Sequence, residues 1–515
     1  MSSVLDDVVD EVEPAASIVS VMAATKPSIL LSIDVGTSGV RASLFDDRGG
    51  ELPGAQARRH RNLVTLSDFA ALDADALVAE VIKTIDELLT YHVHAAAQID
   101  HIAISAFWHS LIGVDAEGLP TTPLLTWADT RAAQFAKTLR TQFDEREIHS
   151  RTGCRFHASY WPAKLQWLKH EHAQKFSATR CWLGFAEYLC LRLCGETATS
   201  ISMASATGLF NQQTCDWDWD FVQALGLSPD TLPEIKATTT VRLAEAFTFR
   251  WPALAESRLV TIAGDGAANN MGAGCSTKQK IALMIGTSGA MRVSFAGEPP
   301  DQIAPSLWSY RASERRVVVG GALSDGGGLI KWLTESLNID PTSLQDELAA
   351  IEPDSHGLTV LPFWSGERST GWSADARGGV FGLRQQTTPV EIVRAALEAI
   401  AYRFALIARD LDRIAANATI IASGNALRSS PVWLQIIADV LGHPLMFGGT
   451  TESSIRGAAL LALEAVGKIA NIDEESVLVE QVFEPDMTRH ARYLEGLARQ
   501  EELYQRLYRS QETNK

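Results

Sequence analysis

The sequence lacks the features that would assign it to a membrane, a secretory or a nucleic-acid-binding class. No apolar run reaches the ~20 residues that a membrane-spanning helix needs. The first 26 residues are acidic and have no basic segment of the kind that opens a signal peptide. Lys and Arg number 45 against 62 Asp and Glu, a formal net charge of −17, so nothing offsets the repulsion of nucleic-acid phosphates. We therefore expect a cytoplasmic protein with no membrane or nucleic-acid partner.

Cysteine is scarce and unpaired in sequence. The six cysteines form no CxxC motif, and only Cys190 and Cys194 are four residues apart. This pattern favours reduced thiols in apolar packing over a disulfide framework or a metal site. Hydrophobic residues make up 46% and charged residues 21% of 515 residues, an ordinary globular composition in a chain too long for one core. Two domains are expected.

Two common nucleotide-binding signatures are also absent. No GxxxxGK[ST] motif occurs, because Thr277 and not glycine precedes Lys278. Gly264-Asp265-Gly266 begins like a dinucleotide fingerprint, but Asn269 stands at the position of its third glycine. A P-loop enzyme and a nicotinamide dehydrogenase are therefore not expected.

The stretch from Leu259 to Gly289 carries the clearest chemical signal. One apolar run ends in Gly264-Asp265-Gly266, and a second ends in Gly286-Thr287-Ser288-Gly289. Strands that stop at glycines expose backbone N–H groups, which suit an anionic phosphate oxygen. We interpret Asp265 as a general base that faces a phosphate-binding loop.

This second loop has a counterpart near the N-terminus. Gly36-Thr37-Ser38-Gly39 has the same four residues, again between apolar runs and again followed by an arginine. The repeat predicts two related domains, each with a glycine-rich hairpin. Asp34 precedes the first loop, whereas Met284 holds the corresponding position before the second, so the two halves should differ in role.

Apolar periodicity predicts strands alternating with helices in both halves, an α/β architecture with two domains and a cleft between them. The periodicity weakens from 232 to 257, so we divide the chain into an acidic extension (1–26, expected to be disordered), an N-terminal domain (27–257) and a C-terminal domain (258–515). Thr388-Pro389 is predicted to begin a long helix as its N-cap and first residue.

Several motifs, in order, resemble the FGGY family of carbohydrate kinases, and most of all its gluconokinases: IDVGTSGVR, WHSLIGVD, WADTR, SMASATGLFN, GDGAANNMGAG, IGTSGAMR, LPFWSGER and SGNALRSSPVWLQIIADVLG. The resemblance runs from Ile29 to Val466. It implies two ribonuclease-H-like domains of the actin/hexokinase type, with ATP and sugar meeting in the cleft.

The resemblance also implies roles for individual residues. Asp265 would be the base that takes the proton from the sugar hydroxyl, and Asp34 the carboxylate linked to Mg²⁺. The implied contacts to ATP are Gly36, Thr37, Ser38, Gly286, Thr287, Ser288, Gly327, Gly424, Asn425 and Ser429.

On the sugar side, the resemblance implies contacts from Trp108, His109, Asp129, Arg131 and Glu187, besides Asp265. The indole would cover a C–H face of the sugar, and the imidazole would donate to a hydroxyl. Arg131 would supply the cation that a carboxylate substrate needs. For Asp129 and Arg131, a salt bridge at a helix N-terminus is the alternative.

Two positions depart from the family pattern. Asn425 stands where relatives carry a second glycine, and Asp325 where they carry a neutral amide. These departures put close approach of the nucleotide in doubt.

The function expected from all of these observations is ATP-dependent phosphorylation of a small sugar or sugar acid, with gluconate as the first candidate. The open alternatives are xylulose or another ketose or polyol as substrate, a sugar- or nucleotide-binding regulator, and an actin-like assembling ATPase. The sequence does not fix the oligomeric state, and a homodimer stays open.

Overall fold

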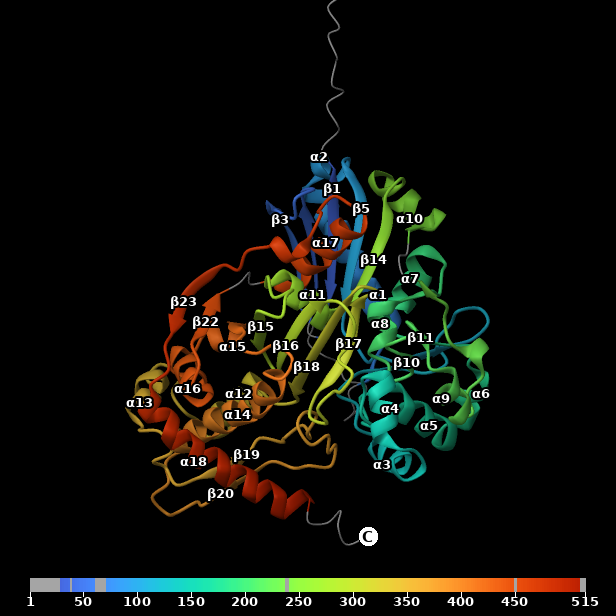
Figure 1. Ribbon diagram of the computed structural model, residues 1–515. Helices are drawn as coiled ribbons and strands as arrows, with labels where there is room; N and C mark the ends of the chain where they lie inside the picture. Colours follow the sequence, from blue (N-terminus) through green and yellow to red (C-terminus); the bar gives the residue numbers. More distant parts are fainter. Residues whose placement is uncertain (1–27, 38, 61–70, 237–239, 449–451, 510–515) are drawn as a thin grey trace, which may run out of the picture.

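The computed structural model describes residues 28–37, 39–60, 71–236, 240–448 and 452–509. It contains two large mixed β-sheets, each covered by helices, with the first sheet at the top of Figure 1 and the second below it. The acidic extension expected over 1–26 lies outside the described residues.

The first sheet has six strands in the order β13-β14-β5-β1-β2-β3. Their bounds are β1 Ile29–Val35, β2 Gly39–Phe45, β3 Glu51–His60, β5 Ile99–Ala106, β13 Val241–Arg242 and β14 Arg258–Gly264. β1 is antiparallel to β2 and parallel to β5, and β5 is parallel to β14. The predicted hairpin around Gly36–Gly39 is therefore confirmed as β1–β2.

Every residue of β1 is buried because helices cover both faces of this sheet. Leu31 and Ile33 share a core with α1 (Ala74–Tyr91) and α7 (Phe185–Cys194). Leu30, which points the other way, packs with α17 (Ser453–Ala465) from the far end of the chain. An uninterrupted apolar run is the sequence pattern of such a two-sided strand.

The second sheet repeats this topology. Its order is β17-β18-β16-β15-β21-β22-β23, with bounds β15 Lys280–Ile285, β16 Gly289–Ala296, β17 Trp308–Ser313, β18 Arg316–Leu323, β21 Thr419–Ser423, β22 Leu445–Gly448 and β23 Val479–Phe483. β15 is antiparallel to β16 and parallel to β21, as β1 is to β2 and β5. The predicted duplication is thus present in the fold.

The expected division at 257/258 differs from the structure. β14 pairs with β5 and completes the first sheet, so residues 258–264 belong to the N-terminal domain. Conversely, α17 lies in the chain between β22 and β23 of the second sheet but packs on the first. The weak periodicity before 258 corresponds to the short elements that precede β14. The sequence of a strand does not reveal which sheet the strand joins.

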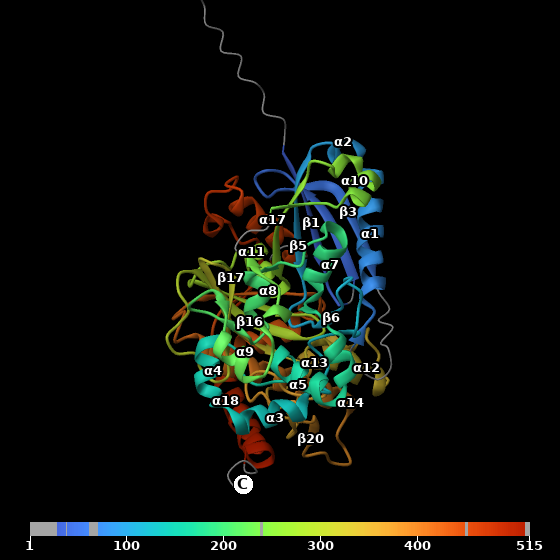
Figure 2. The same ribbon diagram turned by 90° about the vertical axis from the view of Figure 1, so that its right-hand side faces the viewer.

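Two helices cross where the domains meet. α11 (Asp265–Gly272) leaves the end of β14 and packs against α17, and Figures 1 and 2 both place these helices side by side. A Cβ added to Gly272 would lie 1.8 Å from the carbonyl oxygen of Ser453, and one added to Gly457 would lie 1.7 Å from that of Ala268. The helices therefore touch backbone to backbone, which only glycine allows at these points.

A helical unit is inserted between β5 and β14 and occupies the lower right of Figure 1. Its helices are α3 Ala133–Gln142, α4 Glu145–Thr152, α5 Trp161–Glu171, α6 Ala173–Ala178, α8 Ile201–Ser205 and α9 Trp219–Ala224. The C-terminal domain adds α12 Gly327–Ser336, α13 Leu344–Ala350, α14 Pro389–Leu411, α15 Asn425–Arg428, α16 Pro431–Leu441 and α18 Met487–Tyr504. The remaining short elements are α2 Val93–Ala96, α10 Glu245–Arg250, β4 Ala71–Leu72, β6 Ile112–Val114, β7 Leu124–Leu125, β8 Cys181–Leu183, β9 Thr199–Ser200, β10 Phe210–Asn211, β11 Asp216–Trp217, β12 Ile235–Lys236, β19 Thr359–Leu361, β20 Gly379–Phe381, and the helical turns η1 Pro229–Thr231, η2 Pro252–Leu254, η3 Ile472–Glu474 and η4 Gln505–Arg509.

Local sequence signals were accurate where capping chemistry was present. Thr388 and Glu391 form the reciprocal capping box of α14, with Pro389 as its first residue. β19 pairs with β20 in a separate two-stranded sheet.

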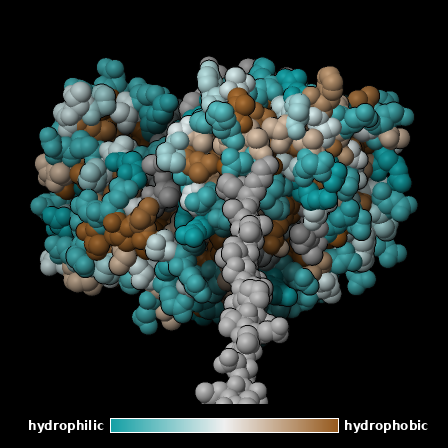
Figure 3. Space-filling view, turned by 90° about the horizontal axis from the view of Figure 1, so that it is seen from above, coloured by the Kyte–Doolittle hydropathy of each residue, from teal (hydrophilic) through white to brown (hydrophobic). Residues whose placement is uncertain are grey.

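The face of the molecule seen from above is mostly polar. Seen from above, hydrophilic side chains dominate the described surface, and hydrophobic ones form separate patches (Figure 3). Within the described ranges, no helix combines the length and the apolar character that crossing a bilayer requires.

Candidate active site

A cavity of about 1000 Å³ lies between the two domains. Three parallel strands of the first sheet end beside it: Asp34 lies near the end of β1, Trp108 follows β5, and Asp265 follows β14. Ligands bind at this carboxyl edge in open α/β sheets. The hairpin between β15 and β16 supplies Gly286, Thr287 and Ser288 from the opposite domain.

The two glycine hairpins face each other across the cavity. The Gly36 N–H donates to the Gly39 carbonyl at 2.9 Å, and the Gly286 N–H donates to that of Ser288 at 2.9 Å. Gly36 and Thr37 line the cavity, whereas Ser38 lies outside the described residues. Short hydroxyl side chains and backbone donors are thus present on both sides.

Gly327 begins α12 directly behind the second hairpin. Its N–H donates to the Gly286 carbonyl at 2.8 Å, and an added Cβ would lie 2.4 Å from the Ala426 Cβ. No larger side chain fits there. As expected, Gly327 lines the cavity.

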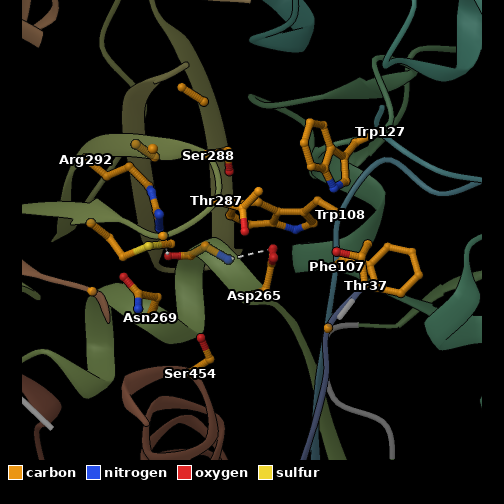
Figure 4. Close-up of a pocket in the computed structure, with 18 of the residues that line it drawn as sticks. Thr37, Phe107, Trp108, Trp127, Asp265, Asn269, Thr287, Ser288, Arg292 and Ser454 are labelled. Carbon is orange, nitrogen blue, oxygen red and sulfur yellow. Dashed lines mark hydrogen bonds between the residues drawn. The ribbon is translucent and has the colours of Figure 1, made fainter. Parts of the chain in front are cut away.

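Asp265 is the first residue of α11 and points into the cavity (Figure 4). Its carboxylate accepts a hydrogen bond from the Gly266 N–H at 2.8 Å. Burial raises the pKa of Asp265 to about 6, while the charge of Arg292 lowers it and that of Asp34 raises it. A carboxyl with such a pKa is ionised at neutral pH and basic enough to accept a proton.

Arg292, on β16 of the second domain, contacts the turn that carries Asp265. It is 4% exposed, and its Nη1 donates to the Gly266 carbonyl at 2.9 Å. The guanidinium therefore binds the same turn of α11 that carries Asp265 (Figure 4).

Asp34 is the second carboxylate of the cavity. It is 4% exposed and forms a salt bridge with Arg41, Nη1 to Oδ2 3.0 Å, and Arg41 also pairs with Glu452. Burial raises the pKa of Asp34, and Arg41 opposes that rise. Oxygen donors of this kind suit Mg²⁺, which keeps most of its waters and takes one or two carboxylates plus substrate phosphates.

The described residues contain one tighter group of potential ligands, Asp354, His356 and Glu398, away from the cavity. Arg394 donates to Glu398 at 2.7 Å and Arg499 pairs with Asp354. These cations make the group a salt-bridge network, so the cavity carboxylates fit a metal better.

Trp108 and His109 form one wall of the cavity. The Trp108 Nε1 donates to the Ser202 carbonyl at 2.9 Å, and its ring lies edge-on to Tyr310 at 5.0 Å. A Cβ on Gly264 would lie 1.7 Å from that Nε1, so the glycine before Asp265 makes room for the indole.

His109 differs in one respect from the expectation. Its Nδ1 lies 2.7 Å from the Ala206 carbonyl, which only accepts, so Nδ1 carries the proton. Burial lowers the pKa of His109 to about 3. The neutral ring therefore presents Nε2 as an acceptor for a hydroxyl proton, where a donor was predicted.

Asp129 and Arg131 do not line the cavity. They bind each other, with Arg131 Nε 3.0 Å and Nη2 2.5 Å from the carboxylate, and Arg131 also lies 4.6 Å above the Trp167 ring. The helix expected to begin here starts at Ala133. The salt-bridge alternative describes this pair, and Trp127 reaches the cavity instead.

Two further expected contacts also lie off the cavity. Glu187 is 2% exposed, accepts from Thr199 Oγ1 at 2.6 Å and has its pKa raised by burial. It is enclosed on α7, outside the cavity lining. Ser429 lies at the exposed end of α15, where its Oγ donates to the Ala426 carbonyl at 3.1 Å.

The structure accounts for both departures from the family pattern. The positive φ of the strand-end turn, +109°, falls on Gly424, so Asn425 needs no special backbone and still lines the cavity. Asp325 lies outside the cavity lining and accepts two hydrogen bonds from Ser365, from its N–H and its hydroxyl, both at 2.9 Å. Its charge is satisfied away from the phosphate loops.

Several cavity residues were not identified as site residues from sequence. Tyr160 and Tyr310, from different domains, share a hydrogen bond of 2.6 Å between their hydroxyls. Cationic side chains also outnumber carboxylates around the cavity: Arg41, Arg292, Lys331, Arg368 and Arg428 against Asp34, Asp265 and Glu452. An acidic protein thus offers a locally cationic site to anionic ligands.

Comparison with known proteins agrees with this geometry. Residues 29–272 match the N-terminal domain, and residues 281–466 the C-terminal domain, of the FGGY family of carbohydrate kinases. The first match includes β14 and α11, as the sheet pairing requires.

Individual relatives share nearly the whole chain. A gluconokinase of Bacillus subtilis is 29% identical over 476 residues, which cover 88% of this chain and 91% of the relative. A gluconate kinase of Lactobacillus acidophilus matches in structure with a TM-score of 0.84 at 26% identity, over 93% of this chain and 98% of the other. A ligand-bound xylulose kinase from that organism matches with the same score, identity and coverage. With both domains matched in order around one interdomain cavity, the chain belongs to the FGGY family of carbohydrate kinases and has the sugar kinase chemistry of that family.

Proposed function

We propose that this kinase transfers the γ-phosphate of ATP to D-gluconate and forms 6-phosphogluconate, with Asp265 as general base. The observation that carries the proposal is the position of Asp265, at a helix N-terminus between two glycine hairpins, with a pKa raised to about 6 by burial. Gluconate is favoured because gluconate-named proteins are among the relatives by sequence and by structure.

In the proposed reaction, the Asp265 carboxylate accepts the proton of the C6 hydroxyl as its oxygen attacks the γ-phosphorus. The bond from that phosphorus to the β-γ bridging oxygen breaks, and ADP leaves. Trp108 covers one face of the sugar, and His109 Nε2 accepts a hydrogen bond from a sugar hydroxyl. Phosphoryl transfer needs mainly positioning and charge neutralisation, which these groups and Arg292 provide.

The nucleotide is proposed to lie along the C-terminal wall. Its phosphates would contact Gly36 and Thr37 on one side and Gly286, Thr287 and Ser288 on the other. Adenine would rest near Gly327, Gly424 and Asn425. The N-terminus of α17, where Ser453 and Ser454 line the cavity, carries a partial positive charge that favours an anion.

Mg²⁺ is the proposed partner of ATP. Asp34, with the nearby Asp265, would hold it through water, and when bound it neutralises phosphate charge. Arg41 keeps Asp34 in place for this role. An enzyme that draws on ATP in this way is expected to work in the cytoplasm.

Xylulose or another ketose or polyol is the second candidate, since the xylulose kinase structure matches equally well. Coupled ADP release with MgATP should be measured on gluconate, xylulose, ribulose, glycerol and erythritol. Turnover on gluconate that disappears in Asp265→Asn supports the proposal, and ³¹P NMR of the product identifies the phosphorylated hydroxyl. Turnover on a neutral sugar alone would replace the substrate and keep the mechanism. A sugar that binds without turnover would indicate a regulator.

A further inference from the structure

Arg368 lies in the cavity wall on the segment between β19 and β20. Its guanidinium lies 4.6 Å from the centre of the Trp127 ring, and its Nη2 donates to the Leu323 carbonyl at 3.0 Å. Its buried Nε has no hydrogen-bond partner. The Trp127 contact and the Leu323 hydrogen bond thus hold the side chain in a fixed orientation, and its terminal nitrogens keep N–H donors for a ligand.

The other cavity cations are already engaged. Arg41 pairs with Asp34 and Glu452, Arg428 pairs with Glu480, and Lys331 lies 3.8 Å from Glu335. Arg292 donates to Gly266 beside Asp265. Among the described residues, no carboxylate forms a salt bridge with Arg368.

The neighbours of Arg368 place it at the end of the cavity that is proposed to bind the sugar. Its charge acts on Tyr160, Tyr310 and His109, which together with Trp127 form the aromatic wall that carries Trp108. In Figure 4, Trp127 lies beside Trp108 on the side away from Asn269 and Ser454. A ligand group near Arg368 therefore belongs to the acceptor and not to adenine.

Asp265 and Asp325 act on Arg368 only through space, so no described carboxylate is in contact with the guanidinium. A planar guanidinium binds a carboxylate through two parallel hydrogen bonds. We propose that Arg368, stacked on Trp127, binds the carboxylate of a sugar-acid substrate and gives the enzyme its preference for acids over neutral sugars. The inference rests on the proposed kinase function and narrows its substrate class. It replaces Arg131, the cation expected from sequence, which is bound to Asp129 outside the cavity.

The test compares D-gluconate with D-gluconamide, which keeps every hydroxyl and replaces the carboxylate with a neutral amide. The readout is the ratio of the two kcat/KM values, because a ratio cancels differences in the fraction of folded enzyme. We expect the wild-type enzyme to prefer gluconate and Arg368→Gln to lower the ratio by about 10- to 100-fold, the effect of losing hydrogen bonds to a charged group. Arg368→Lys, which keeps the charge without the fork, should restore part of it.

Arg131→Gln is the matched control, since it removes an arginine that also stacks on a tryptophan but lies outside the cavity. Its ratio should equal that of the wild type. An unchanged ratio in Arg368→Gln, with both substrates lost equally, would overturn the inference. A reduced ratio in Arg131→Gln alone would also overturn it.

Failure of the proposed substrate is a separate result. If wild-type enzyme does not use gluconate, the same ratio is measured for D-xylonate and D-ribonate and their amides. An acid preferred over its amide, with the preference lost in Arg368→Gln, sustains the inference after gluconate is discarded. No preference for any acid, together with turnover of a neutral sugar, rejects it.

Discussion

At the residue scale, Asp265 has two opposing requirements. In the proposed role of general base, it has to be partly buried beside the reacting atoms, and it has to be ionised to accept a proton. Burial raises its pKa to about 6, and Arg292 limits the rise. The pKa of Asp265 therefore depends in part on a cation from the other domain, so the proposed catalysis should depend on how the two domains meet.

The first prediction concerns pH. The kcat/KM for the sugar should rise with pH through an apparent pKa of about 6 and then level off, as Asp265 loses its proton. Arg292→Met should move this acid limb to higher pH, because the cation that favours the carboxylate is gone. The measurement is a set of kcat/KM values between pH 5 and 9 at saturating MgATP. An acid limb that stays in place in Arg292→Met would contradict the assignment.

The second prediction concerns the stability cost of the same group. The folded-state pKa of about 6 lies above the ordinary aspartate pKa of 3.8, so ionised Asp265 destabilises the fold at neutral pH. That cost is largest above pH 6 and fades as the pH falls towards 4. Asp265→Asn should therefore melt about 1–4 °C higher than wild type at pH 7.5, with a smaller gap at pH 5.

Thermal unfolding of the two proteins at both pH values, without ligands, checks this result. Asn269→Ala is the control, because it is a change on the same helix that alters no charge. If the melting temperature of Asp265→Asn, relative to that of the wild type, rose as the pH fell, ionised Asp265 would be stabilising the fold, which would contradict the prediction.

At the element scale, the crossing of α11 and α17 joins the domains. Gly272 and Gly457 permit backbone contact, and α11 carries Asp265 at its first position while α17 brings Ser454 to the cavity. A shift of either helix therefore moves both the base and the proposed phosphate end of the site.

The third prediction follows from this contact. Gly457→Ala would place a methyl group 1.7 Å from the Ala268 carbonyl oxygen, a backbone atom that cannot turn aside. We expect a loss of about 2–4 kcal/mol in unfolding free energy, together with a lower kcat. Ala465→Ser, at the exposed end of α17, should change stability by less than about 0.5 kcal/mol. Equal stability of the two variants in thermal and urea unfolding would mean that α11 and α17 lie farther apart at Gly457 than the structure shows.

The sequence was sufficient where a feature is local. The β1–β2 hairpin and the N-cap at Thr388 each follow from residues adjacent in the chain, and so does the place of Asp265 at the end of a strand. Assigning β14 to the first sheet was not possible, because pairing with β5 is a contact across the whole helical insertion. Arg131 and Arg368 show the same limit: each stacks on a tryptophan, yet only the tertiary fold determines which one faces the cavity.

At the scale of the whole molecule, the cavity is bounded by two separate contact zones. One is the α11–α17 crossing. The other joins the helical insertion to the second domain, where Ser309 N–H donates to the Gly153 carbonyl at 3.0 Å and Tyr160 bonds Tyr310. Ligands placed between these zones touch both domains, so each ligand favours the same closed arrangement.

The final prediction is therefore mutual binding enhancement. Gluconate should bind more tightly in the presence of MgATP by about 5- to 20-fold, and MgATP should gain the same factor from gluconate, because coupling free energy is reciprocal. Asp265→Asn allows the titration without turnover, and the change in tryptophan fluorescence reports it, since Trp108, Trp127, Trp308 and Trp372 line the cavity. Wild-type enzyme with a non-hydrolysable ATP analogue is the control for the loss of the carboxylate. Independent affinities in both proteins would mean that the domains do not close around the two ligands together. Unequal factors in the two directions would expose a third state, such as a sugar bound outside the cavity, because a closed thermodynamic cycle admits only one coupling value.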